Sequence, residues 1–176
     1  MTHQDSMGDK TVIKAGDVQR MSAGTGLTHS EFNLARDPVH FHQIWILPDQ
    51  KGPTPSDDQK HFAASCWHNT LFPVASGQKL NGAVTFHTAA AIYRCALDQG
   101  REVTHRAAVG RRISVYVTQG ALDINGTTVS EKDQARIDTD DPLVLRASNP
   151  AEFMLIDVPS CKGWGYSAKT LKGQKA

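Results

Sequence analysis

The sequence of 176 residues has few cysteines and no long apolar run. Its three cysteines, Cys66, Cys95 and Cys161, are too few and too scattered for a disulfide framework. No stretch approaches the roughly 20 apolar residues that a membrane helix needs. The first residues also lack the charged and then apolar order of a signal peptide. These absences predict a cytoplasmic protein that does not enter a membrane.

The sequence also lacks an excess of charge of either sign. Lys and Arg together number 19, Asp and Glu number 18, and the formal net charge is +1. Direct binding to nucleic acid therefore has no electrostatic support. Residues 161–176 are the exception, because they contain four lysines and no acidic residue. We interpret this segment as a basic flexible tail.

Short runs of alternating polar and apolar residues, interrupted by turn-forming residues, extend through most of the chain. This pattern predicts many short strands and hence an all-β sandwich or barrel. Asn125-Gly126 predicts a two-residue type I′ hairpin, because both positions tolerate positive φ. Residues 58–68 are the only plausible helical stretch, and the prolines of residues 48–58 indicate a linker. The predicted strands are residues 2–4, 10–14, 18–21, 27–32, 39–47, 71–75, 83–87, 92–97, 102–107, 113–118, 121–124, 127–129, 143–146 and 152–158.

Eight histidines are the main source of candidate chemistry. Side chains two residues apart in a strand share a face, so His29 projects with Glu31, and His40 projects with His42. Either pair could contribute to a transition-metal site of the non-haem iron type. The alternative is that these are ordinary strand residues that face solvent or are hydrogen-bonded in the core. No G-x-S-x-G nucleophile motif is present, and Cys66 and Cys95 fit small buried residues better than nucleophiles.

Several segments resemble the pirin family of bicupins. They are His3-Gln4-Asp5-Ser6-Met7-Gly8, the stretch from Gly16-Asp17-Val18 to His29-Ser30-Glu31, and Gln43-Ile44-Trp45-Ile46. Similar landmarks of the second domain are Tyr93-Arg94, Gly120, Ile124-Asn125-Gly126 and Leu155-Ile156-Asp157-Val158-Pro159. The similarity extends over nearly the whole chain, to about Pro159.

The resemblance implies two cupin barrels in tandem, each a double-stranded β-helix or jelly roll. Residues 1–48 would form the C-terminal part of a first barrel, which is incomplete, and residues 70–160 a complete second barrel. Residues 49–69 would link the two barrels. The resemblance also implies a divalent metal in the first barrel, usually iron, with nickel, copper or manganese as alternatives. Several members of the family have quercetin 2,3-dioxygenase activity toward flavonol-type aromatic substrates, and others are regulatory proteins.

The family holds its metal with three histidines and one glutamate. His29 and Glu31 match the second half of that set, and Glu31 would also be the catalytic base. The first half is an H-x-H motif upstream of the position of His3, and this sequence does not contain it. Either the gene is truncated or Met1 is an internal position. With two ligands we expect weaker metal binding or its loss, unless His40 or His42 substitutes. His105 in the second barrel has no partner at a suitable spacing, so we expect no metal there.

Two functional hypotheses follow. The first is a metal-dependent dioxygenase that uses O2 and a small flavonol-like substrate. The second is a non-catalytic pirin-like module that regulates or binds another protein. Because an antiparallel sheet that starts near residue 2 exposes an edge, we also expect the chain to associate with itself.

Overall fold

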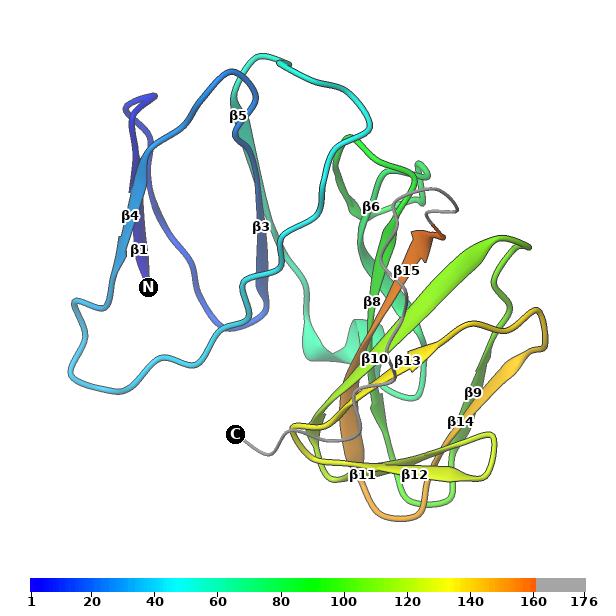
Figure 1. Ribbon diagram of the computed structural model, residues 1–176. Coiled ribbons are helices and arrows are strands. Elements are labelled where there is room, and N and C mark those ends of the chain that lie inside the picture. The colour runs from blue at the N-terminus through cyan, green and yellow to red at the C-terminus, as the bar shows by residue number, and fades with distance from the viewer. Residues whose placement is uncertain (161–176) are drawn as a thin grey trace.

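The computed structural model of the chain describes residues 1–160, which contain 15 strands and one short 3₁₀ helix (Figure 1). The prediction of an all-β protein is confirmed. The predicted basic tail and Cys161 lie outside the described residues. Within residues 1–160, no helix is long and apolar enough to cross a membrane.

Residues 72–159 form two sheets, which we call sheet C and sheet D. Sheet C has the order β13-β10-β15-β8-β6-β7, and sheet D has the order β12-β11-β14-β9. All pairs are antiparallel except β6 and β7, which are parallel. The strands of sheet C are β6 (Phe72–Ser76), β7 (Val84–Thr85), β8 (Ala91–Leu97), β10 (Arg111–Gln119), β13 (Gln134–Ile137) and β15 (Ala151–Pro159). Those of sheet D are β9 (Glu102–His105), β11 (Ala121–Ile124), β12 (Thr127–Ser130) and β14 (Leu143–Ala147).

Alternation in the longest strands produces the core between sheets C and D. In β15, Phe153 and Leu155 are buried, while Met154 between them is partly exposed. Val115 of β10 and Leu145 of β14 are fully buried against them in the same apolar cluster. Burial of this kind is the main favourable term in folding a sandwich. The predicted hairpin is confirmed, since Asn125 (φ 48°) and Gly126 (φ 86°) join β11 to β12.

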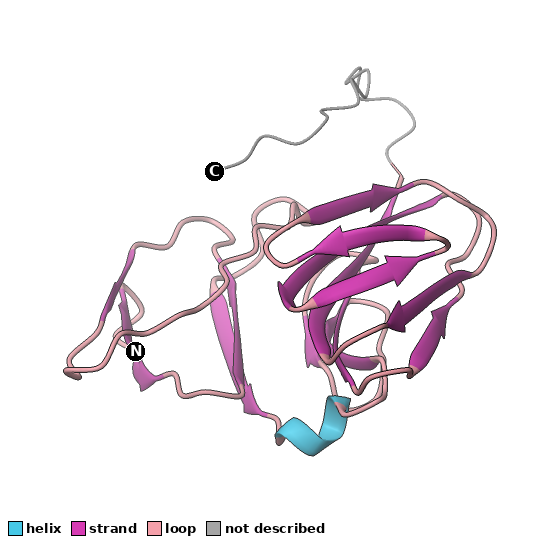
Figure 2. Cartoon of the chain, turned by 90° about the horizontal axis from the view of Figure 1, so that it is seen from below, coloured by secondary structure: helices cyan, strands magenta, loops and turns pink. Residues whose placement is uncertain are grey.

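Sheets C and D together form what we call the second barrel. Residues 1–61 form two smaller sheets beside it. Sheet A has the order β2-β1-β4, from β1 (Thr2–Asp5), β2 (Lys10–Val12) and β4 (His29–Phe32). Sheet B pairs β3 (Asp17–Ser22) with β5 (Ser56–His61). Figure 1 shows β3 and β5 between sheet A and the second barrel. Figure 2 shows the 3₁₀ helix η1 (Ala64–Trp67) where the chain passes from sheet B into the barrel.

Sheet B packs on the outer face of sheet C. Val18 of β3 joins an apolar cluster that includes Phe62, Trp67 and Ile92. The guanidinium of Arg20 donates to the carbonyl oxygen of Thr85 at 3.0 Å, which ties β3 to β7. The second core therefore joins the N-terminal sheets to the barrel.

Two local predictions were wrong, and two strands were not predicted. Residues 39–47 form no strand, because none of the described strands pairs with them, despite their alternating sequence. Residues 58–68 are not a helix: they contain the end of β5, a short extended connection and the single turn of η1. The sequence analysis also did not predict β13, nor β5 within the segment regarded as a linker.

Asp17 holds the two strands of sheet B together. Its carboxylate accepts hydrogen bonds from the backbone N–H of Lys14 at 2.9 Å and from Gln59 at 2.9 Å, and it lies 2.7 Å from Nδ1 of His61. Burial by itself would raise the pKa of Asp17. The hydrogen bonds from Lys14, His61 and Gln59 outweigh burial and place the pKa below the ordinary value of 3.8.

We therefore expect Asp17→Asn to lower the free energy of unfolding at pH 7 by about 1–2 kcal/mol. Because the pKa of Asp17 is lower in the folded state, its stabilisation is complete above the unfolded value and is lost as the pH falls through the folded value. The difference between wild type and variant should thus shrink as the pH falls below 3.8. Urea unfolding from pH 7 to pH 3 measures this difference. A difference that stays constant across this range would show that ionised Asp17 does not stabilise the fold.

Candidate metal and oxygenase site

The pairing of β1 with β4 brings four ionisable residues together. His3 lies opposite Glu31, and Asp5 lies opposite His29. Directly opposite residues of an antiparallel pair share a face, and so do residues two apart in one strand. His3, Asp5, His29 and Glu31 therefore all project from one face of sheet A. We call these four residues the sheet A cluster.

Burial within the sheet A cluster is uneven. His29 is exposed and Glu31 is half-buried, whereas His3 is completely buried. The His3 and His29 rings lie 5.5 Å apart between centroids, and Nδ1 of His3 lies 3.7 Å from Oε1 of Glu31. His29 and Glu31 are thus the members that solvent or a small molecule can reach, and His3 lies beneath them.

The donor types of His29 and Glu31 suit a divalent transition metal, because imidazole nitrogen and carboxylate oxygen are both common ligands. Within residues 1–160, no group of three or more His, Cys, Asp or Glu residues is arranged to hold a metal ion. The two residues therefore fit a metal as a pair of neighbouring donors. Any ion held by them would keep its other coordination positions for water, substrate or further ligands.

His40 and His42 lie elsewhere. They belong to the unpaired segment of residues 39–47, and their rings lie 5.1 Å apart. The ring of His42 lies 5.5 Å from that of Tyr116 in β10 of the second barrel. Burial, with the nearby charges of His40 and Arg94, lowers the pKa of His42. The structure does not group either residue with His29 and Glu31 as a set of three ligands.

A hollow of about 440 Å³ lies between β2 and sheet B, apart from the sheet A cluster. Its lining residues are Val12, Lys14, Asp17, Gln59 and His61. Asp17 is already satisfied there by the hydrogen bonds described above. We place the candidate site at the sheet A cluster, because that is where imidazole and carboxylate donors gather on one face.

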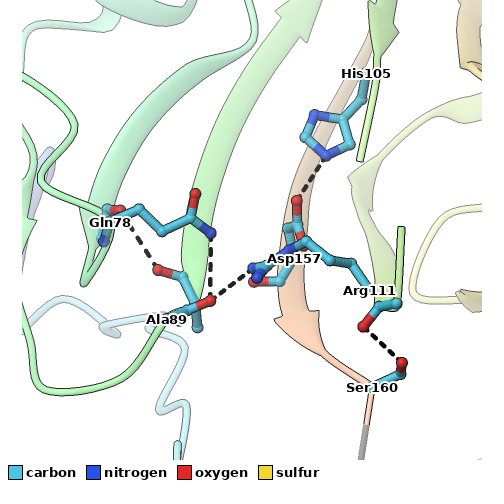
Figure 3. A network of polar contacts seen from close by, with 9 residues as sticks. Gln78, Ala89, His105, Arg111, Asp157 and Ser160 are labelled. Atoms are coloured by element: carbon cyan, nitrogen blue, oxygen red, sulfur yellow. Dashed lines mark hydrogen bonds and ion pairs between the residues drawn. The ribbon is translucent and has the colours of Figure 1, made fainter. Parts of the chain in front are cut away.

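The second barrel contains a buried ionic network that spacing in the sequence did not indicate (Figure 3). His105 of β9 has a hydrogen-bond partner, since its Nε2 lies 3.0 Å from Oδ2 of Asp157 in β15. Arg111 of β10 donates to the same carboxylate through Nε, and to the carbonyl oxygen of Ala89 at 2.7 Å. The partners are 46 and 52 residues apart in sequence. Arg111 and Asp157 lie on paired strands of sheet C, whereas His105 reaches Asp157 from sheet D, so the network forms only where the two sheets pack together.

Cys95 is part of the same barrel and is not a reactive group. It is buried in the apolar core, and burial raises its pKa to about 12. The thiol therefore stays protonated at neutral pH, which agrees with the interpretation of Cys95 as a small core residue.

This arrangement of sheets around an apolar core is that of the cupins, and the comparisons with known proteins agree. A family model described as Pirin matches residues 1–46, and one described as Quercetinase C-terminal cupin domain matches residues 73–158. A quercetin 2,3-dioxygenase of Escherichia coli K12 is 36% identical over 158 residues, which are 89% of this chain and 67% of that protein. A pirin-like protein of Caulobacter vibrioides is 34% identical over 160 residues, 89% of this chain and 68% of that protein.

Among solved structures, YhhW from Escherichia coli has a TM-score of 0.84 and 36% identity, covering 90% of this chain and 67% of that chain. A second structure, of the bacterial pirin YhhW in complex with nickel(II), also has a TM-score of 0.84, with 35% identity and coverage of 90% and 68%. The fold is therefore that of the cupins. The chain belongs to the pirin family, and it spans about two thirds of the length of these relatives.

The buried network predicts a large effect of one substitution in the second barrel. Asp157→Asn removes the carboxylate charge and leaves the mostly buried guanidinium of Arg111 unneutralised. We expect the free energy of unfolding to fall by about 3–5 kcal/mol, the usual cost of breaking a buried ion pair. Chemical unfolding at neutral pH measures this loss.

Asp138→Asn is the matched control. It breaks the exposed pair between Arg112 and Asp138, in which both side chains are about half exposed. Such a pair contributes at most about 1 kcal/mol. Equal losses in the two variants would contradict a special role for the buried network.

Proposed function

We propose that this chain is a pirin-type oxidoreductase of the quercetin 2,3-dioxygenase kind that binds a divalent transition metal through His29 and Glu31. The observation that carries the proposal is the placement of an imidazole and a carboxylate on one face of β4, in a chain 36% identical to a quercetin 2,3-dioxygenase. Iron is the metal that we expect first, and the nickel(II) complex of a relative supports a divalent ion in general. The cytoplasm is the proposed location.

The residues of the site divide the chemistry between them. A bound divalent ion would supply Lewis acidity toward the oxygens of a flavonol. His29, exposed at the start of β4, would be a neutral ligand. Glu31, half-buried and next to His3, would accept the proton of a flavonol hydroxyl and would also be a ligand. The partial burial of the Glu31 side chain would exclude some of the water that competes for that proton.

A non-catalytic, pirin-like interaction module is the second candidate. The observation that favours it is the number of ligands, because the described residues offer two neighbouring donors and no group of three. Metal content and oxygen uptake of the purified chain distinguish the two candidates.

For the enzyme, we expect near-stoichiometric iron, nickel or copper by elemental analysis, and oxygen uptake with quercetin. Glu31→Gln should lower uptake by at least about 100-fold, since it removes the base. His29→Ala should lower the metal content. Ser30→Ala is the control, because Ser30 lies between the two on the opposite face of β4 and should leave both quantities unchanged. A metal-free wild type without uptake would reject the enzyme in favour of the module.

We also propose that copies of this chain associate through the N-terminal region. Sheet A ends in the two edge strands β2 and β4. The unpaired segment of residues 39–47 exposes Trp45 (88%) and Leu47 (84%), while Ile46 between them packs on the core beneath sheet B. Such a row of exposed apolar side chains favours a partner that covers it.

Replacing Trp45 and Leu47 together with serine should therefore raise the dissociation constant for self-association by at least tenfold. Sedimentation equilibrium measures this constant. Val109→Ser is the control, because Val109 is also 84% exposed but lies in the second barrel and is not part of this row. A wild type that stays monomeric at high concentration would reject the proposal.

A further inference from the structure

His3 is the most enclosed ionisable residue of the sheet A cluster. Its side chain has no exposed surface. Neither Nδ1 nor Nε2 has a hydrogen-bond partner among the described residues. A buried polar group without a hydrogen-bond partner lowers the free energy of unfolding. The presence of such a group therefore requires a physical reason.

The groups that flank His3 supply that reason. Nε2 lies 3.7 Å from Oδ2 of Asp5, and Nδ1 lies 3.7 Å from Oε1 of Glu31. Each ring nitrogen thus faces a carboxylate oxygen. An N–H···O bond has a length of about 3.0 Å, so a movement of about 0.7 Å by either carboxylate would form one.

The two carboxylates differ in their freedom to move. Oδ1 of Asp5 accepts hydrogen bonds from the backbone N–H groups of Met7 (2.9 Å) and Asp9 (3.2 Å), which fix it in the turn between β1 and β2. Glu31 has a longer side chain and is partly exposed. The turn therefore holds the Asp5 carboxylate in place, and Asp5 in turn limits the position of the His3 ring. Glu31 is the residue whose carboxylate can move toward His3.

We propose that His3 is a positioning residue for Glu31, and that its Nδ1–H donates to Oε1 when the site takes up a metal ion. This inference rests on the proposed function at the same site. His3 would select one orientation of the Glu31 carboxylate and leave the second oxygen for an ion or a substrate proton. Groups beyond the ligands commonly orient metal ligands through such hydrogen bonds.

Three variants of His3 separate this role from simple packing. His3→Ala removes both nitrogens. His3→Asn keeps an amide near the position of Nδ1, facing Glu31, whereas His3→Gln places it near Nε2, facing Asp5. Titration calorimetry with nickel(II) alone should show that His3→Ala lowers the affinity by about 10–100-fold. His3→Asn should restore most of this loss, and His3→Gln should not.

His68→Ala is the control for general loss of a histidine. His68 is exposed, pairs with Asp98 outside sheet A, and should leave the nickel affinity unchanged. Thermal unfolding of each variant without metal shows whether it is folded. If His3→Ala is unfolded, the comparison of His3→Asn with His3→Gln decides the question.

A second measurement needs no metal. In protein labelled with ¹⁵N-histidine, Glu31→Gln should shift the Nδ1 resonance of His3, because Glu31 faces that nitrogen. Ser30→Ala, on the opposite face of β4, should not. This measurement reports the contact between His3 and Glu31 directly.

The outcomes distinguish this inference from the proposed function. If wild type and His3→Ala bind nickel(II) equally while Glu31→Gln binds it weakly, His3 does not position Glu31 and the proposed function stands. If wild type binds no nickel(II), the proposed function fails. The Nδ1 resonance of His3 then decides whether His3 contacts Glu31. A response of Nδ1 to Glu31→Gln then supports the contact, and an unchanged resonance overturns it.

Discussion

The antiparallel pairing of β1 with β4 is the constraint on which the candidate site depends. This pairing places Asp5 opposite His29 and His3 opposite Glu31. Because side chains alternate between faces, a shift of one residue would move His3 and Asp5 to the face opposite His29 and Glu31. Two bonds just beyond the strand ends continue this register: Ser6 donates its backbone N–H to the carbonyl oxygen of Thr28 at 2.9 Å, and its hydroxyl oxygen accepts from the backbone N–H of Thr28 at 3.2 Å.

The packing of the N-terminal sheets on the barrel supports this pairing. Sheet A is small and has two edges, so its strands gain little from their own hydrogen bonds. Sheet B is better anchored, because Val18 packs into the cluster on the outer face of sheet C and Arg20 bonds to β7. The second barrel is thus a base on which sheet B packs. Within the chain, β3 of sheet B is connected directly to β2 and to β4, the two edge strands of sheet A.

Much of the fold could be predicted from the sequence, because strands with one buried face carry a period of two. The alternation in β10 and β15 and the Asn125-Gly126 turn belong to this class. Residues 39–47 show that a period of two is not sufficient for a strand. Their alternation is as clear as that of a real strand, but a strand also needs a neighbour for its backbone groups, and none of the described strands provides one.

The candidate site was predictable only in part, for a similar reason. His29 and Glu31 are two residues apart, so their shared face follows from the strand period alone. The place of His3 depends on a strand pairing across 28 residues. That of Asp157 beside His105 depends on the packing of two sheets, between residues 52 apart in the sequence. Sequence spacing carries no information about such contacts. A buried histidine between two carboxylates became visible only when the register was known.

The register of β1 and β4 is therefore the central claim, and cross-strand nuclear Overhauser contacts test it most directly. The account predicts contacts between backbone protons of Thr2 and Phe32, His3 and Glu31, Gln4 and Ser30, and Asp5 and His29. Contacts displaced by one residue, with His3 opposite Ser30, would place His3 and Asp5 on the face opposite His29 and Glu31 and would contradict this register.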